Sequence, residues 1–503
     1  MTLRLSIAAL LFADISGCKE APRIELRLIH DGDLALNAPM DLTVRLLSAD
    51  DSTEVSSATL EGTALGGPVR LFDASAMQAG ARYSVTVSAT TRNCLRRNRA
   101  VGRSLPFVHG DGDYAVSLHF GCADEISDAA GTMVQGRIAA TASAFDDGSV
   151  LYYAGATSIG VGTMAGQVTF TDRHEVYDSS TGLFMALPGS AVGSILSSSV
   201  SLGSTVLVVG NGHFEGMDPV CRGTRELWST DGRIDSGTLN HPRCAPLLAP
   251  ISGNRILVVG GVAAATTPPA EIVDSASGSD NVRVGALRFG GLGTALAGDR
   301  TLVVSGNLGP GSRVEILDAS DRPVRAIAVA SATLPDATWS EQTLTYVPCS
   351  SGGGATYIVG GATGRSGMRT ALAEVWCYRD NPAVDGRVIQ AGTLPEGRRS
   401  HGTAVVQGPN RPRLLIVGGF RSEVSTAPVH DEALLGGVNG CACEPIGSWD
   451  RFGGSWPVGL TALLIPRATL LPDGAVLITG VVVFQEDLLE AQGDAFLFIP
   501  DLF

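Results

Sequence analysis

Charged side chains are scarce in this 503-residue sequence, and positive charge is the scarcer sign. Only 17% of the residues are charged, 36 basic side chains stand against 50 acidic ones, and Lys19 is the only lysine. The net charge of −14 excludes attraction of the whole molecule to nucleic acid or to an anionic bilayer. We therefore expect no nucleic-acid partner.

The residue types that build catalytic and metal centres are also few. The chain has eight His and eight Tyr, and the histidines do not stand at ligand spacing from one another. The sequence contains no Walker-type phosphate loop, no zinc signature and no nucleophile elbow. We predict no catalytic residue, no metal ligand, no cofactor and no enzymatic activity.

Apolar runs long enough to span a bilayer as a helix, about 20 residues, are not evident. The N-terminus instead has the outline of a signal peptide, because Met1–Arg4 is short and positive and Leu5–Ala13 is apolar. Ile15–Cys18 (ISGC) resembles the lipobox of bacterial lipoproteins, which implies that Cys18 becomes the lipidated first residue. Asp14 departs from that pattern, and an ordinary cleaved signal peptide is the alternative.

Eight cysteines remain when Cys18 is set apart, and an even number is typical of proteins from an oxidising compartment. Two alternatives stay open for them: some are buried thiols, or Cys441 and Cys443 bind a metal ion together with His430. We expect disulfides within couples that are close in sequence: Cys94 with Cys122, Cys221 with Cys244, Cys349 with Cys377, and Cys441 with Cys443.

Glycine is abundant, with 63 residues, and 44% of the residues are hydrophobic, a balance typical of turn-rich β structure. Seven apolar runs end in glycine, and their closing glycines lie 46 to 62 residues apart. Periods of this size are typical of propellers and solenoids. The runs are SVLYYAG (149–155), VLVVG (206–210), ILVVGG (256–261), LVVSG (302–306), YIVGG (357–361), LLIVGG (414–419) and VLITG (476–480).

Turn residues and another strand-like segment precede each run, so each unit is expected to open as a β-hairpin. The second strand is apolar without alternation, which predicts that both of its faces are buried between sheets stacked around an axis. A closing glycine allows close backbone approach at the end of that strand. A third strand follows a variable loop and often begins with an acid: Glu175, Glu226, Glu271, Glu315 and Glu374.

The segment EVYDSSTGLF, residues 175–184, resembles the Kelch repeat, in which a glycine pair is followed by Tyr and, some residues later, by Trp. Tyr177 occupies the Tyr position and Phe184 replaces the Trp, whereas most other units lack the aromatic pair. His401 matches the histidine that opens a strand of this repeat, and the resemblance therefore implies a structural role for it. The resemblance covers roughly residues 128–503 and implies a seven-bladed β-propeller. We expect residues 131–135 to supply the outer strand of the seventh blade and so to close the ring.

The N-terminal part of the chain lacks the repeat but contains alternating segments at 24–29, 42–47, 83–89 and 114–120. Short strands at this spacing are typical of a small β-sandwich. The predicted fold is therefore all-β, with three parts: a lipoprotein signal peptide (1–17), an Ig-like β-sandwich (18–124) and a Kelch-like β-propeller (125–503).

Two polar clusters leave alternatives open. The segment His109–Asp113 is expected to be a hairpin tip, with a calcium site as the alternative. A group of arginines around Cys94 is expected to lie in a solvated loop, and contact with an anionic partner is its alternative. This group comprises Arg92, Arg96, Arg97, Arg99 and Arg103.

The predicted function rests only on the predicted fold and on the predicted location in the cell. We predict a lipid-anchored envelope protein, held at the outer membrane by its lipid, whose variable loops between second and third strands bind an envelope protein or a glycan. A saccharide-active enzyme of oxidase or epimerase type, with its site at the propeller axis, is one alternative, and a structural surface protein is another. The loops are 156–173, 211–224, 262–269, 307–313, 362–372, 420–430 and 481–493.

Overall fold

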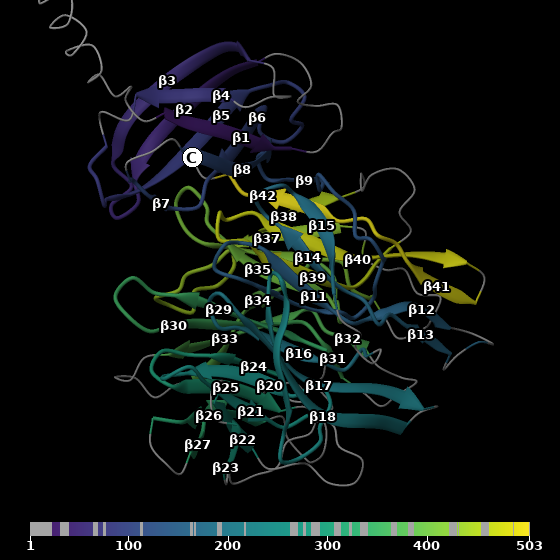
Figure 1. The fold of residues 1–503 in the computed structure, drawn as a ribbon. Coiled ribbons are helices and arrows are strands. Elements are labelled where there is room, and N and C mark those ends of the chain that lie inside the picture. Colours follow the sequence, from purple (N-terminus) through teal and green to yellow (C-terminus); the bar gives the residue numbers. More distant parts are fainter. Residues whose placement is uncertain are drawn as a thin grey trace, which may run out of the picture.

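Every named element in the described part of the chain is a β-strand (Figure 1). No helix among these residues is long and apolar enough to cross a bilayer. The signal peptide and Cys18 lie outside the described residues, as do Asp111–Asp113 of the expected hairpin tip. The computed structural model describes residues 23–30, 40–63, 69–73, 77–110, 114–160, 164, 167–188, 194–215, 218–261, 270–274, 278–282, 292–305, 313–320, 324–331, 341–363, 370–380, 387–421, 430, 432–453, 462–485 and 487–501.

Six sheets form the blades of a propeller-like ring, and the first strands of successive blades contact one another around the axis. The first three blades are β10 (Thr141–Ala144), β11 (Val150–Tyr153), β14 (His174–Asp178) and β15 (Leu183–Leu187); β16 (Ser198–Ser201), β17 (Val206–Glu215), β18 (Asp218–Ser229) and β19 (Gly232–Thr238); and β20 (Leu247–Ile251), β21 (Arg255–Val259), β22 (Ala270–Asp274) and β23 (Gly278–Val282). Blades four to six are β24 (Leu292–Ala295), β25 (Arg300–Ser305), β26 (Arg313–Asp318) and β27 (Arg325–Ala328); β29 (Thr343–Pro348), β30 (Gly354–Val359), β33 (Glu374–Asp380) and β34 (Arg387–Thr393), with β28 (Ala330–Ser331) beside β34; and β35 (Gly402–Val406), β36 (Arg413–Val417), β37 (Glu432–Gly437) and β38 (Trp449–Gly453).

A further sheet closes the ring between blades six and one. It contains β39 (Ala462–Leu470), β40 (Val476–Gln485), β42 (Phe496–Ile499) and β9 (Glu125–Asp128) in that order, and β39 contacts both β35 and β10. The strand β9 comes from the chain before blade one and pairs antiparallel with β42, the last strand of the chain. The first and last strands of the ring are thereby held together.

The strand that closes the ring precedes blade one in the sequence, as expected, but it consists of residues 125–128 and not of residues 131–135. Ile126 of β9 packs against the cluster that contains Phe496 and Phe498, which favours this register. Residues 131–135 lie instead in the connection that leads to blade one, where the N–H of Val134 donates to Glu175 of β14. The prediction that residues 131–135 form this strand is therefore wrong.

The second strand of each blade is buried on both faces, as its unbroken apolar pattern predicts. In β21, Ile256 and Val258 pack into a cluster shared with blade two, and Leu257 and Val259 pack into a cluster shared with blade four. Alternate side chains of one strand thus join both neighbouring sheets. Repetition of this packing around the axis is what the recurrent apolar runs encode.

The N-terminal unit is one hydrogen-bonded sheet with a single core. The four expected segments lie in strands, and β8 pairs parallel with β1 over most of its length and with β6 at its end. Because β8 joins both sets of strands, a sandwich of two separate sheets stays a prediction. The strands are β1 (Arg23–Ile29), β2 (Met40–Ser48), β3 (Glu54–Thr63), β4 (Val69–Asp73), β5 (Arg82–Thr90), β6 (Arg99–Arg103), β7 (Phe107–Val108) and β8 (Tyr114–Cys122).

A buried carboxylate joins the N-terminal unit to the ring. Asp124 is 0% exposed and accepts hydrogen bonds from Arg97, from both terminal nitrogens of Arg413 at 2.8 and 2.7 Å, and from the N–H of Asp501 at 2.9 Å. Nearby, His119 of β8 bridges Asp473 (2.5 Å) and the Tyr177 hydroxyl (2.7 Å). The unit is therefore fixed by polar contacts from both sides of the junction.

The arginine group around Cys94 contributes to this junction. Arg99 pairs with Asp501, and the Arg96 guanidinium lies 4.7 Å from the centre of the Phe452 ring of blade six. Together with Arg97, these side chains bind the chain's own ring. Arg97 stays exposed, as expected for a solvated loop, whereas Arg96 and Arg99 are half-buried by these contacts.

Four disulfides lie in the described chain, and two of the expected pairs, Cys94–Cys122 and Cys221–Cys244, are confirmed. The other two expected pairs, and with them the metal alternative at Cys441 and Cys443, are wrong: the bonds are Cys349–Cys441 and Cys377–Cys443.

The difference between the observed and the expected pairing of these four cysteines has a geometric cause. In blade five, Gly354 at the turn that carries Cys349 opposes Asp380, so Cys377 lies three residues along the strand from that turn. Three residues of strand span about 10 Å, beyond the about 7 Å that a disulfide bridges between Cα atoms. The loop after β37 of blade six covers this edge, and each of its two cysteines reaches one of the two positions.

Candidate binding face

The variable loops that the structure describes project from one face of the ring as β-hairpins. The hairpin of β12 (Ala156–Gly160) and β13 (Val168–Phe170) follows the second strand of blade one, and β41 (Leu488–Ala491) follows β40. Because β12 pairs with β41, the two hairpins form a continuous sheet in the order β13-β12-β41-β40. Figure 1 shows this sheet extending away from the ring on the same side as β17 and β18.

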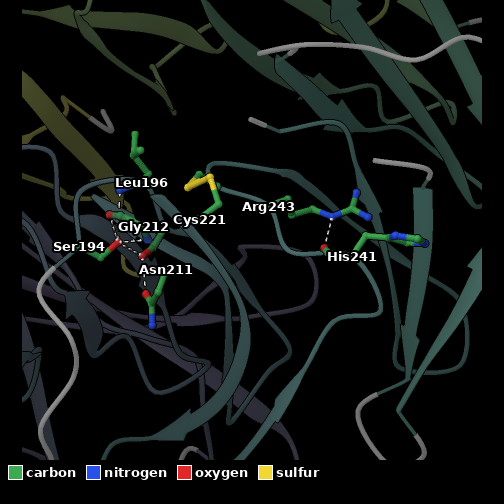
Figure 2. Close-up of a disulfide and its surroundings, with 9 residues drawn as sticks. Ser194, Leu196, Asn211, Gly212, Cys221, His241 and Arg243 are labelled. Atoms are coloured by element: carbon green, nitrogen blue, oxygen red, sulfur yellow. Dashed lines mark hydrogen bonds between the residues drawn. A yellow bond between two sulfur atoms is a disulfide. The ribbon is translucent and has the colours of Figure 1, made fainter. Parts of the chain in front are cut away.

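The third hairpin, of blade two, is held by a disulfide. Cys221 in β18 bonds to Cys244 in the connection that leads to blade three (Figure 2). A Cβ on Gly212 would lie 2.1 Å from the sulfur of Cys244, so glycine is needed where β17 passes the bond. At the near side, the Phe170 ring meets the His213 ring edge-on at 6.0 Å, which places the hairpins of blades one and two in contact.

Buried Arg–Glu pairs anchor the chain beneath this face. Arg243, just before the first strand of blade three, donates to Glu271 at 2.5 Å, and both side chains are 0% exposed. Glu271 also accepts the N–H groups of Asn240 and His241, and the Arg243 guanidinium donates to the carbonyl of Gly260, where the second strand ends. This ion pair thus holds the segment that leads into blade three against the end of its second strand and against its third strand.

The same device recurs in blades one and six. Arg137 pairs with Glu175 and donates to the Ala154 carbonyl at 3.2 Å. Arg398 pairs with Glu432 at 3.1 Å and donates to the Gly418 carbonyl at 3.3 Å. Because a buried charge requires a partner, these pairs hold the roots of the projecting hairpins in one geometry.

Neighbouring inner strands meet through small hydroxyl side chains. The hydroxyls of Thr141 and Ser143 each lie 2.7 Å from that of Ser199, between blades one and two. Between blades five and six, Thr345 and Thr403 meet at 2.8 Å. These contacts are uncharged and join adjacent blades near the axis.

One charged cluster lies near the axis between blades five and six, on the side of the hairpins. Arg399 donates to Glu341 at 2.6 Å, Ser400 also donates to Glu341, and the Arg399 guanidinium lies 4.7 Å from the centre of the Phe420 ring. Arg399 and Phe420 also exchange backbone hydrogen bonds. The cluster combines charge, hydroxyl and aromatic surface, a combination suited to recognition of a polar ligand.

Three histidines near this face, His174, His401 and His430, are buried and neutral. Burial lowers the pKa of His174 and of His401 to about 3, and that of His430 to about 4. His401 is 4% exposed, and its Nε2 lies 2.9 Å from the Thr343 hydroxyl, which confirms the structural role expected from the sequence. None of these three groups is poised to exchange a proton near neutral pH.

Several expected features stay outside the described structure. The loops 262–269 and 307–312 are not described, nor are most of 362–372 and 420–430. No group of three or more His, Cys, Asp or Glu residues in the described part of the chain is arranged to hold a metal ion.

The arginines of the buried pairs were not predicted, although two of the acids, Glu175 and Glu271, were noted as strand openers. The signal was available: Arg137, Arg243 and Arg398 each stand four residues before the first strand of a blade that has such a glutamate. A repeated arginine at one place in a degenerate repeat indicates a repeated contact.

Comparisons with known proteins add little. No family model matches this sequence, and no curated protein matches it. Among solved structures, one titled "Structure of YjhT" is similar to this chain with 13% sequence identity and a TM-score of 0.45, covering 64% of this chain and 99% of that one. At this level of similarity, no activity or ligand carries over.

Proposed function

We propose that this chain is a lipid-anchored cell-envelope protein that binds a partner protein or a glycan through the projecting hairpins of its ring. The observation that carries the proposal is the pairing of β12 with β41, which turns two loops into a continuous projecting sheet. Loops presented on a rigid scaffold are a common place for binding residues. The alternatives of a saccharide-active enzyme and of a structural surface protein stay predictions from the sequence.

The proposal includes the finer architecture and the cell address. The strand order β39-β40-β42-β9 supports a seventh blade and hence a seven-bladed Kelch-like ring, which averaged electron-microscopy views along the axis will count. Four disulfides support an oxidising compartment outside the cytoplasm.

The binding face is tested by photo-crosslinking in the native cells. A photoreactive amino acid at Ser158 of β12 or at the exposed Thr169 of β13 is expected to give a discrete crosslinked product. The matched control positions are the exposed Ser320 and Asp231, which lie in turns at the other end of the blades. Equal crosslinking from both sets, or none from the hairpins, contradicts the proposed face.

The anchor is tested by the intact mass of membrane-extracted protein beside a Cys18→Ala variant. We expect a chain that begins at residue 18, carries acyl groups and has no alkylated thiol when alkylation is done without reduction. The Cys18→Ala protein should lack the acyl groups. An unprocessed N-terminus contradicts lipid anchoring, whatever the crosslinking shows.

A further inference from the structure

The disulfides of blades five and six are interleaved along the chain. Each of the first two disulfides of the chain joins consecutive cysteines. The last two do not, because Cys349 bonds to Cys441 and Cys377 bonds to Cys443, so each bond passes over one cysteine. Four cysteines can pair in three ways, and the interleaved way has to form in preference to the pairing of neighbours.

Loop closure in the unfolded chain favours the pairing of neighbours instead. Cys349 and Cys377 are separated by 28 positions, whereas 92 positions separate Cys349 from Cys441. Because the probability that the ends of a flexible loop meet falls as about the 3/2 power of its length, Cys349 meets Cys377 about sixfold more often than it meets Cys441. Cys441 and Cys443 are then left to bond to each other.

The Cys349–Cys377 bond and the folded blade five exclude each other. Cys377 lies opposite Tyr357 in the pairing of β33 with β30, three residues along the strand from the turn that carries Cys349. This separation is about 10 Å, and a disulfide bridges no more than about 7 Å between Cα atoms. A chain with the Cys349–Cys377 bond therefore leaves blade five incomplete, and its sulfur atoms stay open to attack by a thiolate.

The native Cys377–Cys443 bond is shielded from such attack. Cys377 is 0% exposed, and Cys443 packs against the core cluster that contains Tyr357 and Ile446. The loop that carries Cys443 is fixed there, because the Tyr357 hydroxyl accepts from the N–H of Asn439 and donates to its carbonyl, both at 3.1 Å. Thiol–disulfide exchange depends on access to the sulfur, so exchange at this bond stops once blades five and six have packed together.

We propose that this chain is a substrate of a thiol–disulfide isomerase, an enzyme with a reactive Cys-X-X-Cys thiolate, which converts the bonds Cys349–Cys377 and Cys441–Cys443 into the native pair. The inference shares with the proposed function only the oxidising compartment. It uses neither the hairpin face nor the lipid anchor.

The conversion needs no net oxidant or reductant, because each step exchanges one thiolate for another. The isomerase thiolate attacks Sγ of Cys349, which forms a mixed disulfide and releases Cys377 as a thiolate. That thiolate attacks Sγ of Cys443, which forms the Cys377–Cys443 bond and releases Cys441. The Cys441 thiolate then attacks Cys349 in the mixed disulfide, which completes the second native bond and releases the isomerase thiolate.

The test starts from the reduced, unfolded full chain with Cys18→Ala, which keeps the eight cysteines of the four disulfides. The chain is diluted into folding buffer, oxidised with diamide and freed of the oxidant, and half of it is then incubated with protein disulfide isomerase. Peptide mapping without reduction should find Cys349 linked to Cys377 about sixfold more often than to Cys441 before the isomerase acts, and linked to Cys441 afterwards. The two bonds between consecutive cysteines should be present in both halves.

Two double variants provide matched controls. Cys349→Ser together with Cys441→Ser leaves one partner for Cys377 among these four cysteines, so its native bond should form without the isomerase. Cys221→Ser together with Cys244→Ser removes a bond between neighbours and should leave the dependence on the isomerase unchanged.

The unaltered eight cysteines decide the proposal, even where a variant fails to fold. Any main bond of Cys349 other than that to Cys377 before the isomerase is added overturns it, and so does a Cys349–Cys377 bond that the isomerase leaves in place. Failure of the hairpin face in the crosslinking test changes neither result.

Discussion

The buried histidines have a consequence at the scale of single residues. His401 immediately precedes β35 and is 4% exposed, and burial lowers its pKa to about 3. In the unfolded chain a histidine binds a proton near pH 6.5. Between these two values the unfolded state holds more protons than the folded state, so the free energy of unfolding falls as the pH falls.

We predict that His401→Gln makes the protein less sensitive to acid. A histidine that stays neutral in the folded state should lower the free energy of unfolding by about 2 kcal/mol between pH 6.5 and pH 5, because each pH unit contributes about 1.4 kcal/mol. Urea unfolding of both proteins at pH 7 and pH 5 measures the difference. An equal loss in parent and variant would mean that His401 is protonated in the folded protein.

The Arg–Glu pairs show why single residues of this site were hard to predict. A glutamate at the start of a strand is visible in the sequence, but its partner stands 38 residues away for Glu175 and 28 for Glu271. The two charges meet only because the segment before the first strand of a blade packs against the end of its second strand. Without that packing, Arg243 is indistinguishable from a surface arginine.

At the scale of elements, the disulfides Cys349–Cys441 and Cys377–Cys443 join blade five to blade six. They close loops of 92 and 66 residues, whereas Cys221–Cys244 closes a loop of 23. Longer closed loops restrict the unfolded chain more strongly. These two bonds link neighbouring sheets, and each is expected to stabilise the folded state at least as much as a disulfide within one blade.

We predict that peptide mapping without reduction recovers Cys349 linked to Cys441 and Cys377 linked to Cys443. Replacing Cys377 and Cys443 together by Ser should lower the free energy of unfolding by about 4 kcal/mol, against about 3 kcal/mol for the matched pair Cys221 and Cys244. Denaturant unfolding of the two variants provides the comparison. Recovery of a peptide that links Cys349 to Cys377 would contradict the assignment.

Elements were more predictable than their partners. The apolar runs locate the second strands because burial on both faces leaves a local signal, as in β21 and β36. The bonding of Cys443 depends on where the loop after β37 folds over blade five, and no local pattern encodes that position. The projecting hairpins were expected only as loops, since the pairing of β12 with β41 joins segments from opposite ends of the ring.

At the scale of the whole molecule, Asp124 couples the N-terminal unit to the ring. Burial would raise the pKa of Asp124, but hydrogen bonds from Arg413, the Asp501 N–H and Arg97 outweigh that effect and hold the pKa below its usual value. A carboxylate with a lowered pKa stabilises the folded state above its unfolded pKa and loses this contribution as the pH falls through its folded pKa.

We predict that Asp124→Ala loosens the junction. Removing one partner from a buried ionic contact typically lowers stability by about 3–5 kcal/mol, because the remaining charges stay buried without compensation. Calorimetry should show one unfolding transition in the parent and two in the variant, as the N-terminal unit and the ring unfold separately. A single, unshifted transition in the variant would show that Asp124 does not couple the parts.

The pairing of β9 with β42 sets the order in which the molecule can be completed. Because the chain is synthesised from its N-terminus, β9 is available before β42. During that interval two sheet edges remain without partners, and such edges are templates for association with other chains. A chaperone that masks the edge of β9 would protect the incomplete chain, and a protease that cuts before Phe496 would leave a ring that cannot close.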